Sequence, residues 1–167
     1  TGQEPYTILM TIQEILFGAS DISLRFLATD IDLEVLKTAA EGYYSKEDVA
    51  GVPESLLQEF FARENSPNKD GFRVRAAYRK MIRFAPFNLV QSAYQFQHSF
   101  DLIFCRNVLI YFNSETTKTV LNNLSHCLSP GGVLCIGHSE AGTMRHPEMK
   151  SIAPAAYRRI SSIGGLE

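Results

Sequence analysis

The residues most suited to chemistry lie where a short apolar segment ends in a polar step. Residues 100–104 are mostly apolar, and Cys105, Arg106 and Asn107 follow them directly. A helical pattern, a Pro-Gly-Gly turn and a second apolar segment come next, in the order of a strand–helix–strand unit. In an open α/β sheet, ligands bind beside the loops at the carboxyl ends of strands. The sequence therefore predicts a binding site at Arg106 and Asn107.

Asp30 is a second candidate, because it follows the short apolar segment 24–29. A carboxylate at the end of a strand offers two acceptor oxygens and charge-assisted hydrogen bonds to both hydroxyls of a ribose. The alternative is a simple turn or capping residue. Asp32 is expected to cap a helix that ends at Gly42.

His138, Ser139 and Glu140 raise a different possibility, since Ser, His and an acid together suggest a hydrolase. No Gly-x-Ser-x-Gly motif occurs, and neighbours in sequence do not converge as a catalytic triad does. A NAD-dependent oxidoreductase would use a Gly-x-Gly-x-x-Gly loop, which the sequence also lacks. The three other histidines do not have the spacing of metal ligands, so no metal site is predicted.

The composition is typical of one globular domain. The 167 residues suffice to bury about two-thirds of the surface that the unfolded chain exposes. Sixteen Lys and Arg against 18 Asp and Glu give a formal charge of −2, which argues against a nucleic-acid partner. No apolar run approaches the roughly 20 residues of a membrane span, and no signal peptide opens the chain. The sequence thus predicts a cytoplasmic protein without membrane insertion, with its three cysteines reduced.

The middle of the chain differs in pattern from both ends. Residues 72–76 and 81–84 alternate in polarity, and turn-forming residues precede them. Two alternating segments this close predict a hairpin, or part of a small antiparallel sheet. We therefore expect an inserted β subdomain at residues 43–86, with residues 1–42 and 87–167 forming one α/β domain around it.

Five segments together indicate a family: TGQEPYT at the start, NL at 88–89, CRNVLIYF at 105–112, PGG at 130–132 and GHSE at 137–140. They closely resemble the chemotaxis-receptor methyltransferases of the CheR type, and the resemblance covers nearly the whole chain. Those enzymes use S-adenosylmethionine to esterify glutamates on receptor helices. The resemblance implies an α/β, Rossmann-like methyltransferase fold with a small inserted antiparallel β subdomain. It also implies a protein-glutamate O-methyltransferase activity in chemotactic signalling, with S-adenosylhomocysteine as product and no metal.

The resemblance further implies a cofactor site. Glycine near the start lets the backbone approach the ligand, and the helix start presents N–H groups to its carboxylate. An amide at position 88 would bond the adenine edge while the next leucine covers its face; the alternative is a loop Asn followed by a core Leu. The implied cofactor residues are Gly2, Glu4, Asp30, Asn88, Leu89, Cys105, Arg106 and Asn107.

For the reaction, the resemblance implies that Asn107 and Tyr111 flank the transferring methyl group. We expect Arg106 to hold or neutralise the incoming glutamate carboxylate and Tyr111 to orient it. The alternative for this segment is a solvated loop with a half-buried aromatic side chain. The GHSE loop, with His138, would close the substrate side.

The expected partners are the cytoplasmic helices of chemoreceptors (methyl-accepting chemotaxis proteins), which carry clustered glutamates. Arg73 and Arg75 begin a run of five basic residues within eleven positions, on the subdomain that faces the receptor in the family. A positive surface there would steer an acidic partner. The alternative is a solvated strand face.

The chain begins inside the cofactor loop of the family pattern, so we expect an N-terminally truncated fold. The first strand and a small helical domain are absent from it, and the strands near 24–29 and 100–105 should each keep one unpaired edge. The chain alone would then bind cofactor poorly. The rival hypothesis is a non-catalytic module that keeps the fold to bind receptors or other partners; the absent loop favours it, whereas the intact polar residues favour the enzyme.

Overall fold

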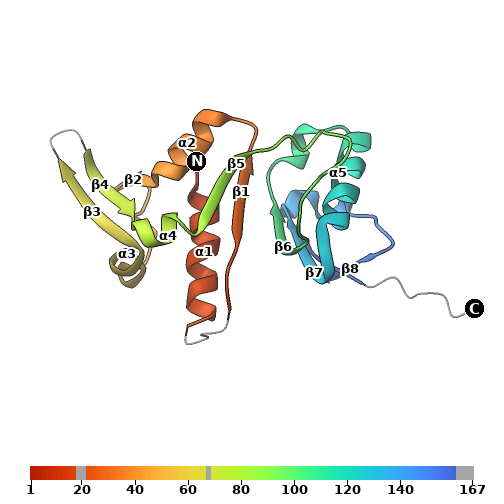
Figure 1. Ribbon diagram of the computed structural model, residues 1–167. Helices are drawn as coiled ribbons and strands as arrows, with labels where there is room; N and C mark the ends of the chain where they lie inside the picture. The colour runs from red at the N-terminus through yellow and green to blue at the C-terminus, as the bar shows by residue number, and fades with distance from the viewer. Residues whose placement is uncertain (18–21, 67–68, 161–167) are drawn as a thin grey trace, which may run out of the picture. The chain divides into compact units, whose positions relative to one another are not determined.

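The structure is a computed structural model that describes residues 1–17, 22–66 and 69–160. The chain divides into two compact units, Thr1–Asn88 and Leu89–Glu167, called the first and second unit below. Figure 1 labels most of their helices and strands. Each unit contains one pair of parallel strands, and polar loops follow the ends of those strands.

The first unit contains a parallel β pair beside two helices. Its elements are α1 (Gln3–Ile15), β1 (Phe26–Asp30), α2 (Leu33–Glu41) and β5 (Ile82–Pro86). The first strand pairs with the last in parallel, with Asp30 opposite Pro86. α1 and β1 run in opposite directions (Figure 1), so the first turn of α1 lies towards the carboxyl ends of both strands.

The ends of α2 form as the sequence predicts. The Asp32 side chain accepts hydrogen bonds from the backbone N–H groups of Glu34 and Val35, at 2.8 and 3.3 Å. Gly42 ends the helix in the left-handed conformation, with φ of 60°. A glycine is favoured there because it has no Cβ to clash with the backbone. The predicted cap and stop are therefore confirmed.

An antiparallel sheet occupies the middle of the first unit, in the order β2-β4-β3. The elements of this region are β2 (Tyr43–Ser45), α3 (Glu54–Phe60), β3 (Phe61–Ser66), β4 (Lys69–Val74) and α4 (Ala76–Arg79). A small antiparallel sheet is thus present, but the predicted hairpin between residues 72–76 and 81–84 is wrong. β4 pairs with β3, while residues 82–84 belong to β5 and pair with β1. Alternating polarity predicts a strand but does not identify the strand with which it pairs. In the structure, α4 separates the two segments.

The second unit contains a four-stranded sheet in the order β6-β7-β9-β8. β6 and β7 are parallel, and the other neighbours are antiparallel. The elements are β6 (Phe100–Cys105), η1 (Leu109–Tyr111), α5 (Ser114–Cys127), β7 (Leu128–Ile136), η2 (His138–Thr143), β8 (Met149–Ala153) and β9 (Ala156–Arg159).

α5 and one face of this sheet form the core of the second unit. Val120, Leu121 and Leu124 of α5 are buried there, and Asn113 caps the helix by accepting the Thr116 N–H at 2.8 Å. β6 is not buried on both faces, however. Leu102 and Phe104 project from its other face and are 40% and 39% exposed, because α5 packs on the face that carries Ile103 and Cys105. The apolar segment at 100–104 therefore forms a strand that is buried on one face only.

β1 and β6 each keep one open edge among the described residues. There β1 pairs with β5 alone, and β6 pairs with β7 alone. This agrees with the expectation of one unpaired edge on each of these strands. Such edges present unpaired backbone N–H and C=O groups to a further strand.

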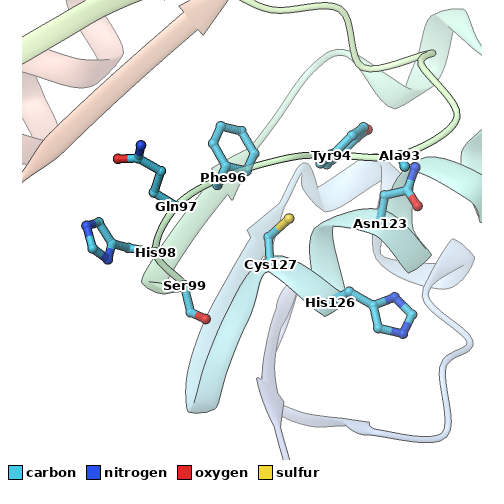
Figure 2. Close-up of a pocket in the computed structure, with 9 residues that line it drawn as sticks. All are labelled: Ala93, Tyr94, Phe96, Gln97, His98, Ser99, Asn123, His126 and Cys127. Atoms are coloured by element: carbon cyan, nitrogen blue, oxygen red, sulfur yellow. The ribbon is translucent and has the colours of Figure 1, made fainter.

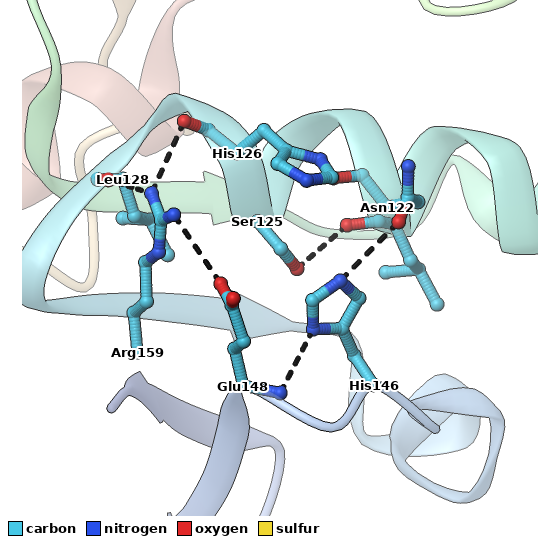
Figure 3. A network of polar contacts seen from close by, with 8 residues as sticks. Asn122, Ser125, His126, Leu128, His146, Glu148 and Arg159 are labelled. Atoms are coloured by element: carbon cyan, nitrogen blue, oxygen red, sulfur yellow. Dashed lines mark hydrogen bonds and ion pairs between the residues drawn. The ribbon is translucent and has the colours of Figure 1, made fainter. Parts of the chain in front are cut away.

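A polar network joins the end of α5 to β9 and to the segment before β8 (Figure 3). Arg159 donates to the carbonyl oxygen of Leu128 at 2.6 Å and pairs with the Glu148 carboxylate at 3.3 Å. The Glu148 N–H donates to Nδ1 of His146, and Nε2 of His146 lies 3.2 Å from Oδ1 of Asn122. Nδ1 accepts in this arrangement, so the network requires a neutral His146 ring with its proton on Nε2.

Candidate functional site

Asp30 and Asn88 lie at the same edge of the first unit. Asp30 is the last residue of β1 and Asn88 follows β5 by two residues, and these strands are parallel neighbours. One carboxylate oxygen of Asp30 accepts the backbone N–H of Asp32 at 3.0 Å. Asp30 therefore has the turn role of the alternative hypothesis, but this one bond leaves acceptor capacity on the carboxylate. Asn88 is exposed at the edge.

Gly2 precedes α1 in the left-handed conformation, with φ of 93°. A Cβ added to Gly2 would lie 2.8 Å from the hydroxyl of Tyr44 and 2.9 Å from Cβ of Ala39. Glycine is therefore required here by packing within the first unit, whatever ligand approaches the loop. Glu4 lies in the first turn of α1. The structure thus places all four first-unit candidates towards one end of that unit.

The candidates of the second unit also lie at one edge. Cys105 ends β6 and is buried in the core, while Arg106 and Asn107 beyond it are exposed. His138 follows the neighbouring parallel strand β7 after Gly137. A Cβ on Gly137 would lie 3.5 Å from the Asn107 backbone nitrogen, so the two loops are in contact. The structure brings these residues together.

The turn after β6 has an unusual backbone. Asn107 has φ of 57°, in the left-handed region that few non-glycine residues adopt apart from Asn and Asp. The short helix η1 follows, and Tyr111 at its end is 79% exposed. Tyr111 is therefore not the half-buried aromatic of the alternative hypothesis. Its hydroxyl is available to a ligand at this edge.

Leu89 has a structural role that the sequence left open. It is half-buried and packs against the hydrophobic core of the second unit. This agrees with the core-leucine alternative. The adenine contact of Asn88 and Leu89 stays a prediction, as does a single ligand site shared by the residues of both units.

Arg73 and Arg75 make structural contacts that the sequence did not predict. Arg73 pairs with both carboxylate oxygens of Glu64, at 2.6 and 3.2 Å, and donates to the Glu41 carbonyl oxygen at 2.8 Å. Arg75 donates to the carbonyl oxygens of Gln58 and Glu59. These carbonyls belong to the last turns of α2 and α3, where cations are favourable. The hydrogen bond to Glu64 raises the pKa of Arg73, and Glu64 offsets its charge.

Glu140 is a residue of this edge whose role the sequence did not reveal. Its carboxylate accepts the backbone N–H groups of Gly137 at 2.7 Å and Ile110 at 3.1 Å. The signal was present in the spacing, because an acid three residues after a helix-capping position is the pattern of a capping box. Only the first of these two bonds follows from that pattern.

A cavity of about 370 Å³ lies elsewhere in the second unit (Figure 2). Tyr94, Phe96 and Ser99 line it on one side, and Asn123 and Cys127 of α5 line it on the other. Ser99 precedes β6, whereas the predicted site follows its end, about 20 Å along the strand at 3.3 Å per residue. Burial raises the pKa of the Cys127 thiol, so this cysteine is not an activated nucleophile.

The three cysteines are free thiols. No cluster of three or more His, Cys, Asp or Glu with the geometry of a metal site occurs among the described residues. In that same part of the chain, no helix has the length and apolar character needed to span a membrane.

Helices, parallel strand pairs and polar loops at the strand ends define an α/β protein of the kind that binds nucleotide-like cofactors. Residues 1–158 match the family described as CheR methyltransferase, SAM binding domain. The chain belongs to this family. The α/β, Rossmann-like methyltransferase fold predicted from the sequence is therefore confirmed, as is the resemblance that led to it.

Curated relatives are named chemotaxis protein methyltransferases. The chain is 40% identical over 140 residues to the chemotaxis protein methyltransferase of Escherichia coli (strain K12), a match that covers 84% of this chain and 49% of that protein. It is 36% identical over 161 residues to that of Borreliella burgdorferi (strain ATCC 35210 / DSM 4680 / CIP 102532 / B31), covering 95% of this chain and 55% of that protein. The chain thus spans about half the length of these relatives.

Among solved structures, the crystal structure of the N-methyltransferase NodS from Bradyrhizobium japonicum WM9 aligns with a TM-score of 0.44 and 14% identity. The alignment covers 82% of this chain and 74% of that chain. These values are too low to add to the fold assignment, which rests on the family match.

Proposed function

We propose that this chain is the cofactor-binding part of a protein-glutamate O-methyltransferase, which uses S-adenosylmethionine to methylate chemoreceptors. The observation that carries the proposal is the match of residues 1–158 to the CheR methyltransferase SAM-binding family. The curated relatives, named chemotaxis protein methyltransferases, support the same activity.

The residues present fit the proposed cofactor by the chemistry of their donors and acceptors. Asp30 supplies acceptor oxygens for ribose hydroxyls, and Asn88 supplies an exposed amide for the adenine edge. Gly2 has no side chain to cap α1, so the first-turn N–H groups suit the carboxylate of an amino acid. Glu4 and the backbone of Cys105, Arg106 and Asn107 complete the proposed set.

The proposed reaction does not require a strong general acid or base from the protein. When bound, S-adenosylmethionine supplies a methyl group activated by a sulfonium sulfur. A glutamate side chain, with a pKa of about 4.3, is already an ionised nucleophile at neutral pH. The protein must hold this carboxylate in line with the methyl group and exclude water from it. Positioning of this kind can contribute about 7–11 kcal/mol.

We assign the positioning of the receptor glutamate to Arg106 and Tyr111. The guanidinium of Arg106 suits a carboxylate because it donates two parallel hydrogen bonds and carries a fixed positive charge. The hydroxyl of Tyr111, exposed at the same edge, would donate a third bond. His138, exposed after the neighbouring strand, would lie on the substrate side.

The test is transfer of labelled methyl groups to chemoreceptor membranes by the complete protein. Replacing Arg106 with Ala should lower kcat/KM by about 100-fold or more, and Tyr111→Phe by about 10-fold, because each loses contacts to a charged group. Arg145→Ala is the control, since Arg145 is an exposed arginine of the same unit outside the site.

Near-normal transfer by both site variants contradicts the assigned roles. Absence of transfer by the wild-type protein, together with receptor binding, would instead favour the rival hypothesis of a non-catalytic receptor-binding module.

We also propose that residues 43–86, which include the β2-β4-β3 sheet, α4 and β5, face the receptor, whose clustered glutamates would meet their basic residues, Arg73 and Arg75 among them. Since these two arginines also hold α2 and α3, their replacement would disturb the fold. Lys80 and Arg83 are exposed members of the same run, and the described residues provide no ion pair to either. Their double reversal to Glu should raise the receptor KM at low salt and have less effect at high salt. An unchanged KM at low salt contradicts this orientation.

A further inference from the structure

Glu140 is the only Asp or Glu that is buried among the described residues, with 2% of its surface exposed. An ionisable group is costly to bury unless hydrogen bonds compensate for the water that it loses. A buried acid therefore needs a reason in the structure. The proposed reaction does not use Glu140, because the nucleophile is an ionised glutamate of the substrate.

The contacts of Glu140 join two loops. One carboxylate oxygen accepts the N–H of Gly137, the residue that follows β7, at 2.7 Å. The other accepts the N–H of Ile110, in the middle of η1, at 3.1 Å. We call this pair of hydrogen bonds the Glu140 bridge. Since β6 and β7 are parallel neighbours, the bridge ties together the loops that follow their carboxyl ends.

The bridge requires a glycine at position 137. A Cβ on Gly137 would lie 2.3 Å from the Glu140 carboxylate oxygen, which is closer than any real Cβ contact. The neighbouring residue Ala141 is also held, because the Tyr157 hydroxyl of β9 donates to its carbonyl oxygen. The carboxylate is thus fixed from the side of β7 and β9, and η1 is the element that it restrains.

The restrained turn has little internal support. η1 has three residues, no side chain caps its start, and the hydrogen bonds of such helices are weaker than those of α-helices. Asn107 before it adopts the left-handed backbone conformation. A turn of this kind keeps one conformation only when its surroundings impose it. The bond from Ile110 to Glu140 is such a restraint, and Tyr111 is the next residue.

We propose that Glu140 is a positioning residue, whose carboxylate holds the turn that carries Asn107 and Tyr111 against the end of β7. This inference rests on the proposed function, in which Asn107 and Tyr111 flank the reacting groups. Glu140 itself touches neither cofactor nor substrate. It acts through the backbone of Ile110.

The wild-type protein gives a first test that does not depend on activity. Ile110 is 54% exposed, so without a specific acceptor its amide would exchange rapidly with water. With the Glu140 bridge, amide exchange measured by NMR should be slowed at Ile110 by about 100-fold or more. An unprotected Ile110 amide overturns the proposal.

The second test is Glu140→Gln in the complete protein. The amide keeps the shape of the side chain but presents N–H groups to one of the two backbone donors, so the bridge is broken. We expect faster exchange at Ile110 and a kcat lower by about 10- to 100-fold, since a misplacement of about 1 Å has effects of that size. The receptor KM should stay within about 2-fold, because the contacts proposed between residues 43–86 and the receptor are unchanged.

The kcat values refer to protein that binds S-adenosylhomocysteine, so a loss of folded protein alone leaves them unchanged. Glu115→Gln is the matched control, because Glu115 is an exposed glutamate in the first turn of α5. Wild-type kcat for Glu140→Gln overturns the proposal. So does an equal loss for Glu115→Gln.

Gly137→Ala carries the same test if Glu140→Gln does not fold. Its added methyl group displaces the carboxylate while Glu140 itself remains, and it should lower kcat in the same way; a folded variant with normal kcat contradicts the bridge. A wild-type protein that transfers no methyl group refutes the proposed function. In that case the amide exchange rate of Ile110 still tests whether the Glu140 bridge exists. An active wild-type with a normal Glu140→Gln variant refutes the further inference only.

Discussion

Each unit places an acidic residue at the edge where its parallel strands end, but the two residues are held in different ways. Asp30 of the first unit is half-buried and bonds the N–H of Asp32, two residues away. Glu140 of the second unit is buried and bonds the N–H of Ile110, thirty residues away. A local bond shapes one turn, whereas a long-range bond fixes one loop against another.

This difference indicates different tasks for the two carboxylates. One carboxylate oxygen of Asp30 accepts a hydrogen bond within its own turn, and the carboxylate has acceptor capacity left for a ligand. Glu140 uses both oxygens on the backbone of its own unit. We therefore expect Asp30 to bind a ligand and Glu140 to hold two loops of the second unit in place.

The largest difference should appear in stability. Glu140→Ala leaves two backbone N–H groups without their acceptor and should lower the free energy of unfolding of the second unit by about 3 kcal/mol. Asp30→Ala removes one hydrogen bond near the surface and should cost the first unit less than about 1 kcal/mol. Native-state hydrogen exchange reports the two units separately. Equal losses in both units contradict the distinction.

For cofactor affinity, replacement of Asp30 should have a greater effect than replacement of Glu140. Asp30→Ala should raise the Kd of S-adenosylhomocysteine by about 10- to 100-fold, because charge-assisted bonds to the ribose contribute about 1.5–3 kcal/mol. Calorimetry on the complete protein measures this constant. Asp32→Asn keeps the helix cap and is the matched control, with no change in Kd expected. An unchanged Kd for Asp30→Ala refutes the binding role.

The two helix caps provide a further comparison, with smaller expected losses in the free energy of unfolding. Asp32 accepts two backbone N–H groups at the start of α2, whereas Asn113 accepts one at the start of α5. Replacement by Ala should cost about 1 kcal/mol at each cap, with the greater loss at Asp32. Urea denaturation measures both, and Asp32→Asn and Asn113→Asp should stay within about 0.5 kcal/mol of the wild type. A greater loss at Asn113 contradicts the geometry.

The smallest expected effect is a dependence on pH that belongs to the second unit, which contains all four histidines. Burial, and then the nearby His126, lower the pKa of His146 below its ordinary value of 6.5. The folded state thus prefers neutral His146, so its contribution to stability is present above pH 6.5 and is lost as the pH falls towards the lowered pKa.

Lowering the pH from about 7.5 to about 5.5 should therefore reduce the Tm of the second unit by about 1–2 °C. His146→Gln should remove this dependence, which differential scanning calorimetry can detect. If the Tm of that variant falls as much as that of the wild type, other titratable groups cause the dependence on pH.

Features that depend on a few neighbouring residues could be predicted from the sequence. The Asp32 cap, the Gly42 stop and the inward face of α5 each arise from contacts within about one helical turn. The strand ends that carry Asp30 and Arg106 followed from apolar segments interrupted by polar residues. The family motifs then added the chemistry.

Features that depend on distant partners could not be predicted. The alternating segment at 81–84 fits a hairpin as well as a parallel pair, and its partner β1 lies some fifty residues earlier in the chain. In the same way, nothing near Arg73 in sequence identifies Glu41 of α2 as its acceptor. The role of Glu140 was missed because half of its bridge lies in another loop.

The backbone of Asn107 has a consequence for mutagenesis. Because φ is 57° there, Asn107→Ala would remove the amide and strain the main chain at the same time. A routine alanine scan would thus merge two separate defects into one number. Asn107→Gly deletes the side chain while leaving the left-handed turn relaxed, so the difference between these two substitutions isolates what the amide itself contributes.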